Sequence, residues 1–476
     1  MVSIAILARL LSPSEFGIVA MAGSVVALIE VLAAFGFDWA LMRVPQRTRA
    51  HYDTAWTLRV LCGLAIFVVL AAVAYPAAIY FRQPAVTAIV VAMGANGVIG
   101  SLENIGVVDF RLQMRFDREF RLRTAGKIVG ILVSVGWALA TRSYWALILG
   151  VTASKLAGTL LSYVMHDFRA RWDLSQAAVL LNFSIWLMIG NVADVMSSRF
   201  ADLWLGRNLG SARVGLYSMA SELSTLATTE FAAPINRAVY TRYLEMADDI
   251  PRLREAFMRV SGVIWAIGFP AALGLGVCAH QIVALLLGSQ WHDAASVLQV
   301  LAAAGVISIS AANTHYVYWA LGKSKFVTIL SLVGTVGFVV LTVLLGRRFG
   351  LIGVAIAQVL ALSLVVTVNF VALLRTLELR ASELLRRNYR VVVASVLMAT
   401  AASWIGARVT QAGVTGAAPQ LAAMVGSGAL VYCLSLLGLW SVLRRPVGPE
   451  QQLIDIVYRI LGRASGKHSS DDLGIL

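Results

Sequence analysis

Blocks of about 20 apolar residues recur along nearly the whole chain, and they constrain its fold more than any other feature. A helix of that length spans the ~30 Å hydrocarbon core of a bilayer, and in lipid every backbone polar group needs a partner within the protein. Stretches such as 61–74 are apolar on all sides, whereas barrel strands alternate apolar and polar residues. The sequence therefore predicts an all-α integral membrane protein.

The composition agrees with this class, and the sequence contains no signature of an enzyme. Charged residues make up 13% of the chain, about half the share found in soluble domains. The three cysteines, Cys62, Cys278 and Cys433, each lie alone in an apolar block and are interpreted as buried hydrophobes. The sequence contains no Walker A motif, Ser-His-Asp candidate or metal-ligand cluster. We therefore predict no catalytic residue, no metal and no cofactor.

Thirteen full spans are predicted after a short apolar stub at 1–9. A helix of nine residues rises only ~14 Å, so we expect the stub to be the end of a first helix that is truncated in this sequence. The full spans are expected at 16–37, 60–81, 86–107, 125–141, 144–164, 178–198, 214–235, 260–287, 294–321, 325–345, 350–374, 390–407 and 420–443.

The distribution of the basic residues predicts the orientation of the chain in the membrane. If the stub counts as helix 1, alternate loops and the tail hold 29 of the 39 Lys and Arg residues, the opposite loops hold nine, and Lys155 lies inside a span. Loops rich in Lys and Arg stay in the cytoplasm. The pattern predicts fourteen helices with both termini cytoplasmic, and it accounts for the net charge of +14 without a nucleic-acid partner.

An internal repeat joins two parts of the chain. The segment 8–22 reads ARLLSPSEFGIVAMA and the segment 206–220 reads GRNLGSARVGLYSMA; identical residues recur at an offset of 198. Such duplication is typical of transporters, whose substrate path lies between the copies. We predict two six-helix lobes, 1–165 and 166–375, followed by two further helices in 376–445 and a cytoplasmic tail, 446–476.

Three stretches combine basic and apolar residues: 110–123, 240–259 and 449–463. Amphipathic helices of this kind lie in the headgroup plane of a membrane. The alternative is that they are solvated connections between spans.

The repeat motif resembles the junction of helices 1 and 2 in Wzx-type polysaccharide flippases, in the branch that includes the colanic acid exporter. The resemblance continues through GFDWAL at 36–41, DTAWTLRV at 53–60, GSQWHDAASVLQVLAAAG at 288–305 and YWALGKSK at 318–325, and it fades in the last two predicted helices. These proteins form part of the multidrug/oligosaccharidyl-lipid/polysaccharide superfamily.

The resemblance implies two six-helix lobes around a central cavity. It implies movement of undecaprenyl-diphosphate-linked oligosaccharides from the cytoplasmic to the periplasmic leaflet of a bacterial inner membrane, by alternating access. It further implies Na⁺ or H⁺ as a coupling ion and polysaccharide polymerase machinery as a downstream partner.

Charged residues inside predicted spans are the first candidates for contacts in such a cavity. A charge near the bilayer centre costs at least ~2.5–3.5 kcal/mol, so it usually faces water or a partner. The candidates are Glu30, Glu103, Lys155, Asp194, Glu222 and Glu230.

Lys155 is the deepest of these residues. We interpret it as a contact for the anionic diphosphate, or as half of an ion pair that breaks during transport. The alternative is a fixed pair with Asp194 or Glu222.

The carboxylates also have alternative partners. Glu30 and Glu103 lie towards the cytoplasmic ends of their spans, where Arg43 and Arg111 respectively could pair with them. Glu222 and Glu230 are candidate proton or cation carriers, but Glu230 could instead pair with Arg237.

Four further residues complete the candidate set. Arg9 and Arg207 are equivalent in the repeat; a guanidinium binds phosphate bidentately, or it snorkels to the outer headgroups. Asn313 and His315, beside Tyr316, form a mixed polar and aromatic group suited to sugar; the alternative is that His315 is a hydrogen-bonded structural residue.

Three other functions remain open. A small-molecule antiporter of the multidrug type and a flippase for the peptidoglycan lipid precursor would share the fold. A membrane glycan polymerase or ligase would usually carry a large periplasmic loop, and no predicted periplasmic loop here exceeds about 16 residues.

Overall fold

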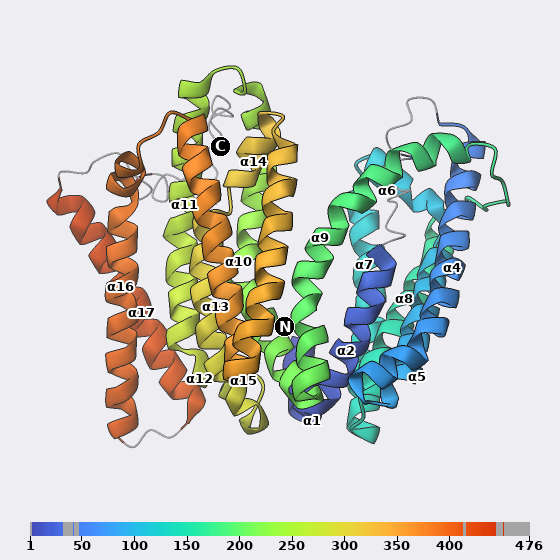
Figure 1. Cartoon of the computed structure of the whole chain (residues 1–476), viewed down its shortest axis with the longest axis horizontal. Coiled ribbons are helices and arrows are strands. Elements are labelled where there is room, and N and C mark those ends of the chain that lie inside the picture. Colours follow the sequence, from blue (N-terminus) through green and yellow to red (C-terminus); the bar gives the residue numbers. More distant parts are fainter. Residues whose placement is uncertain (1, 32–40, 42–46, 413–415, 444–450, 452–476) are drawn as a thin grey trace, which may run out of the picture. The chain divides into compact units, whose positions relative to one another are not determined.

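The computed structural model describes residues 2–31, 41, 47–412, 416–443 and 451, with the side chains of 2, 178–191, 193, 194 and 227–231 excepted. Every regular element within these ranges is a helix (Figure 1). The predicted all-α membrane class is confirmed. The structure divides into two compact units, one formed by 1–218 with 286–290 and the other by 219–285 with 291–476.

Local sequence signals account for the helix boundaries. Helix α1 covers Val2–Leu10, and α2 covers Pro13–Glu30. The Ser12 hydroxyl and Glu15 carboxylate form a capping box, in which each side chain accepts from the other residue's backbone N–H. Pro13 occupies the first helical turn, where its missing N–H costs nothing. The predicted stub and first full span therefore meet at a well-defined helix start.

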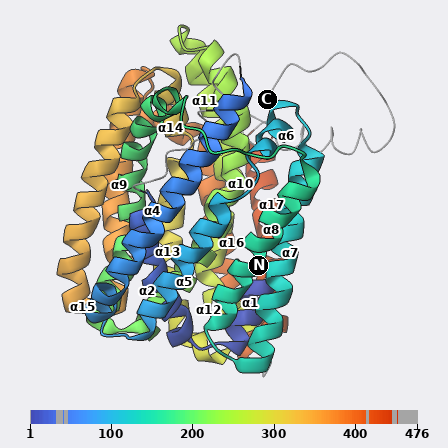
Figure 2. The same cartoon turned by 90° about the vertical axis from the view of Figure 1, so that its right-hand side faces the viewer.

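In the first unit, α5 (Ala85–Ser101) contacts three neighbours, α2, α4 (Arg49–Phe81) and α8 (Trp145–Met165). Helix α8 also pairs along its length with α7 (Phe116–Thr141), and α9 (Ala177–Leu209) packs against α2. Figure 2 shows α4, α5, α7 and α8 side by side. After Ser101 the chain bends by 67° into a short 3₁₀ turn, Ile105–Val107, and α6 (Val108–Leu112).

The second unit is built from α10 (Ser211–Glu245, shared at its start with the first unit), α11 (Ile250–Val277), α12 (Ala279–Leu286), α13 (His292–Ser310), α14 (Thr314–Ala320) and α15 (Ser324–Thr376). Helices α16 (Ala381–Gln411) and α17 (Ala417–Val442) pair with each other and pack on α11. One large apolar core, which includes Tyr243, Phe257 and Tyr318, joins all of these helices except α12.

Length and composition qualify nine helices of the described residues as membrane spans, or ten if the bent α5–α6 pair counts as one. Helix α15 contains two predicted spans, which meet at a kink at Gly350, where φ is 59°. Helices α9 and α10 cover two other predicted spans, and part of each has side chains outside the described ones. The count of fourteen helices stays a prediction, and so do the lobe boundaries.

Two predicted surface helices are parts of longer elements. Residues 110–123 are divided between α6 and the first turns of α7 by a tight turn at Met114, whose φ is 56°. Residues 240–259 are divided between α10 and α11. A helix continuing from each span satisfies more backbone groups than a separate surface helix would. The third stretch, 449–463, and most of the predicted tail lie outside the described residues.

Candidate functional site

Two predicted charged residues meet on one face of α5. Glu30, at the end of α2, lies over Gly97, and Lys155, in the middle of α8, lies over Gly100. A Cβ atom at Gly97 would be 3.5 Å from Glu30 Oε1, and one at Gly100 would be 3.2 Å from Lys155 Nζ. The glycines stand one turn apart on the helix, so they give room for both side chains on the same face.

The two charges attract each other across this face without closing into an ion pair in the described structure. Lys155 acts electrostatically on Glu30, and both residues are exposed. An ammonium group carries three donors and no acceptor. The arrangement therefore leaves Lys155 able to bind an anion while Glu30 lies close enough to compete for it.

Arg59 extends the polar group to the end of α5. It belongs to α4, and its guanidinium donates to the Ser101 carbonyl at 3.0 Å and to the Glu103 carbonyl. These carbonyls have no intrahelical partner because the helix breaks here. Arg59 thus holds the end of α5 in place. Gly100, the glycine over which Lys155 lies, is in the last turn of this helix.

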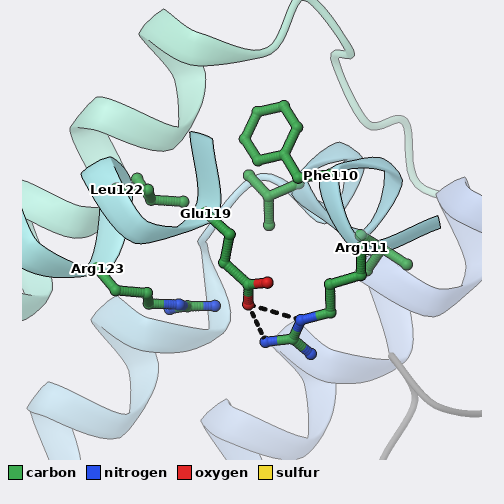
Figure 3. A pocket seen from close by; sticks show the side chains of 7 residues that line it. Phe110, Arg111, Glu119, Leu122 and Arg123 are labelled. Carbon is green, nitrogen blue, oxygen red and sulfur yellow. Dashed lines mark hydrogen bonds and ion pairs between the residues drawn. The ribbon is translucent and has the colours of Figure 1, made fainter. Parts of the chain in front are cut away.

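Glu103 pairs with Arg123 of α7 at 3.1 Å. Its predicted alternative partner, Arg111, is instead paired with Glu119. Figure 3 shows this second pair in a small pocket lined by residues of α6 and α7, with Arg123 on the other side of Glu119. The carboxylate of Glu103 therefore has a structural partner in the first turns of α7.

The repeat-equivalent arginines have different surroundings. Arg207 donates to the Tyr80 carbonyl at 2.6 Å and lies over the Tyr80 ring at 5.4 Å. Arg9 is exposed on α1, where a Cβ at Gly288 would be 3.9 Å from its Cγ. Arg207 thus has a fixed position within the first unit.

The remaining candidates are spread through the second half of the chain. Glu222 is exposed on α10. The side chains of Asp194 and Glu230 lie outside the described ones. Asn313 is 3% exposed and donates to the Tyr243 hydroxyl at 2.7 Å, while His315 is half-buried. The amide of Asn313 therefore has internal partners in this structure.

Sequence reasoning missed Arg59 and Arg123, which it placed on loops as topology signals. The signal that could have found Arg59 is its position at the edge of an apolar block, where α4 continues from Arg49 without a break.

Fold and site together define a polytopic helical membrane protein with a pair of opposite charges on a glycine face. The family model described as "Polysaccharide biosynthesis protein" matches residues 6–296. The chain belongs to this polysaccharide biosynthesis protein family.

Relatives in the family come from several bacteria. The lipopolysaccharide biosynthesis protein WzxC of Escherichia coli (strain K12) is 22% identical over 320 residues, which are 64% of this chain and 63% of the relative. The succinoglycan biosynthesis transport protein ExoT of Rhizobium meliloti (strain 1021) is 25% identical over 310 residues, 63% and 61% of the two chains. The chain thus spans less than two thirds of the length of these relatives.

Solved structures share the fold. The lipid II flippase MurJ, in an inward closed conformation, matches with a TM-score of 0.73 at 11% identity, over 93% of this chain and 96% of that one. An inward-facing multidrug resistance MATE family transporter matches with a TM-score of 0.62 at 16% identity, over 79% and 93%. The protein therefore shares its fold with these two membrane proteins.

Proposed function

We propose that the protein translocates undecaprenyl-diphosphate-linked oligosaccharide repeat units from the cytoplasmic to the periplasmic leaflet, for exopolysaccharide, O-antigen or capsule synthesis. The family and the relatives named for polysaccharide biosynthesis and transport support this substrate class. The likeness to a lipid flippase supports the fold that such movement requires. The protein acts as a carrier without chemical conversion of the lipid, and movement is by alternating access.

The observation that carries the proposal is the position of Lys155 over Gly100 on α5. A diphosphate that enters the membrane needs a compensating charge, because an isolated ion in a medium of low dielectric is strongly disfavoured. Lys155 supplies that charge at the midpoint of a span. Glu30 on the same face is its alternative partner, so it competes with the diphosphate and favours release.

The coupling ion and the orientation belong to the same proposal. A carboxylate beside an ammonium group, such as Glu30 beside Lys155, can take up a proton or Na⁺ when the lysine is engaged elsewhere. Both termini lie in the cytoplasm, following the distribution of Lys and Arg. Polysaccharide polymerase machinery on the periplasmic side consumes the product.

A genetic assay with a chemical readout tests the proposal. The gene is deleted in its host, and lipid-linked repeat units are assayed by leaflet, using their accessibility to a sugar-modifying enzyme added to the periplasm. We expect the units to accumulate in the cytoplasmic leaflet and the wild-type gene to restore export. Lys155→Ala should fail to restore export although it inserts normally, and Lys155→Arg should restore part of it.

Three results would contradict the proposal. Normal periplasmic exposure of the repeat units in the deletion strain would remove the lipid-linked oligosaccharide as the substrate. Full export by Lys155→Ala would remove the role of the lysine. Rescue of a strain depleted of its lipid II flippase would move the substrate to the peptidoglycan precursor.

A further inference from the structure

Two helices break at matching positions in the two units. Helix α5 ends at Ser101, and Asn104 precedes the 3₁₀ turn of the bend. In the second unit, α13 ends at Ser310, and Asn313 precedes α14. Each serine hydroxyl donates back to the carbonyl three residues earlier, at 2.7 and 2.6 Å. These are helices 4 and 10 of the predicted repeat, which would make the two breaks equivalent features of its two copies.

A long side chain from a neighbouring helix holds the serine carbonyl at each break. Arg59 Nε donates to Ser101 at 3.0 Å, and Trp265 Nε1 donates to Ser310 at 3.2 Å. The asparagines are both buried, with 1% and 3% of their surface exposed. Up to this point the two breaks are built alike.

The partners of the two asparagines differ. Asn104 Nδ2 donates to the carbonyls of His166 and Phe168, at 3.0 and 2.8 Å, while its Oδ1 accepts from Gly106 N–H. Residues 166 and 168 belong to the connection between α8 and α9. Asn313 Nδ2 instead donates to the hydroxyls of Tyr243 and Ser261, on α10 and α11. Only the break in α5, of the two, is tied to a connecting segment.

Buried polar side chains on α4 hold the rest of this connection. Asp53, Thr54 and Thr57 are at most 5% exposed. Asp53 accepts from Arg171 N–H at 2.8 Å, Thr57 from Asp173 N–H at 3.1 Å and Thr54 from Gln176 N–H at 3.4 Å. Thr57 is four positions from Asp53 and three from Thr54, spacings that place side chains on the same side of a helix, so α4 presents these acceptors together to the backbone of 171–176.

Close packing fixes the start of the connection against the bend. A Cβ at Gly106 would be 2.3 Å from His166 Nδ1, so the glycine leaves the room that the His166 ring occupies against the bend. His166 also lies 3.4 Å from the Asp109 carboxylate, which accepts from the Tyr52 hydroxyl at 2.6 Å. Trp56 and Trp172 pack edge to face with ring centroids 5.3 Å apart.

We propose that residues 166–176 form a latch. Their binding to α4 and Asn104 holds the bend between α5 and α6, and their displacement by movement of α9 releases it. Without its two carbonyl partners, the buried amide of Asn104 must rearrange, because an unpaired buried donor is unfavourable. This rearrangement of Asn104 takes place near Arg59 and near Gly100, the glycine over which Lys155 lies. The latch goes beyond the proposed function and can be tested without any substrate.

Hydrogen–deuterium exchange on the full-length protein in lipid nanodiscs tests the latch. In the wild type, we expect the amides of Arg171, Asp173 and Gln176 to exchange far more slowly than in a free peptide. Thr57→Val keeps the size of the side chain but removes its hydrogen bonds to the connection. It should raise exchange about fivefold at Asp173 and also at 105–108, the effect of losing one hydrogen bond.

Coupling must also run in the opposite direction, because linkage is reciprocal. Asn104→Asp keeps the shape of the side chain and removes its donors, so it should speed exchange at 171–176. The matched control is Ser261→Ala at the other break, which should affect 309–320 and leave 102–112 and 166–176 unchanged. Melting temperatures identify any variant that fails to fold.

Three results would overturn the latch. If the wild-type connection exchanges at the rate of a free peptide, the segment is unattached; this measurement needs no variant. If Thr57→Val loosens only 171–176, or Asn104→Asp loosens only 102–108, the connection and the bend are independent. Failure of the substrate assay described above would leave all these readouts unaffected.

Discussion

Gly17 and Gly215 pack against each other's helix start in a reciprocal contact. A Cβ at Gly17 would be 1.8 Å from the Ser211 carbonyl oxygen, and one at Gly215 would be 1.9 Å from the Pro13 carbonyl oxygen. Each residue of one pair is the repeat equivalent of a residue in the other, at the same offset of 198. The two copies of the repeat motif thus cross backbone to backbone within the first unit.

Substituting either glycine of the crossing should destabilise the protein. Gly17→Ala places a methyl group on a carbonyl that cannot move aside as a side chain can, and overpacking of this kind costs ~1–3 kcal/mol or more. The measurement is the melting temperature of the purified protein in one detergent. Gly23→Ala, on the same helix, is the matched control, because its Cβ would meet nothing within 4 Å. It should be neutral or slightly stabilising, and equal losses in both variants would exclude the crossing as the cause.

The crossing can also be closed covalently. Ser14 Oγ and Ser211 Oγ lie 2.7 Å apart, so Ser14→Cys with Ser211→Cys should form a disulfide without backbone movement. The three native cysteines are first replaced by serine or alanine. If alternating access separates the two motif copies, oxidation should stop export and a reductant should restore it. The single-cysteine variants control for the substitutions, and undiminished export by the fully cross-linked protein would show that this crossing stays closed throughout transport.

The room that Gly100 leaves for the Lys155 side chain on α5 is predicted to matter more for transport than for stability. Gly100→Ala would put its Cβ 3.2 Å from Lys155 Nζ and 3.4 Å from its Cδ, and the flexible side chain would move aside. We expect a stability change within ~0.5 kcal/mol and a clear loss of export in the leaflet assay. Gly158→Ala on α8, whose Cβ would meet nothing within 4 Å, is the control. Comparable export by the two variants would argue against a role for the position of Lys155.

The ion pair between Glu255 and Arg387 attaches α16 to α11. Both carboxylate oxygens accept from the guanidinium, each at 3.1 Å. Because Glu255 is 41% exposed, solvent screens the pair, and Arg387→Met should lower the free energy of unfolding by only ~1 kcal/mol. The difference from wild type should shrink at high salt. Arg386→Met, at the exposed neighbouring position, should have no such salt-dependent effect.

The class of fold could be predicted because it depends on composition and on the length of apolar blocks. The repeat could also be found, because Arg207, Gly215 and their equivalents keep a fixed spacing. The lengths of α7 and α11 could not, since their charged first turns read as separate surface helices. Only the tertiary structure shows that these turns continue the spans.

The charged residues of the candidate site could be predicted from the sequence, but their arrangement in space could not. Lys155 and Glu30 stand out because charges are rare in apolar blocks. Their meeting on α5 depends on two glycines among 39, and no local pattern distinguishes those two. The segment DTAWTLRV is part of the family resemblance, but the role of Asp53 and Thr57 as acceptors for 171–176 depends on residues more than 100 positions away.

The most direct test of the central claim uses purified protein in proteoliposomes that carry a fluorescent undecaprenyl-diphosphate-linked oligosaccharide. Exposure of the probe on the outer leaflet is followed with a membrane-impermeant quencher. The account predicts that wild-type protein moves the probe between leaflets, that Lys155→Arg moves it more slowly, and that Lys155→Ala leaves it as slow as protein-free liposomes. Equal rates for wild type and Lys155→Ala, or no movement by the wild type above protein-free liposomes, would contradict the account.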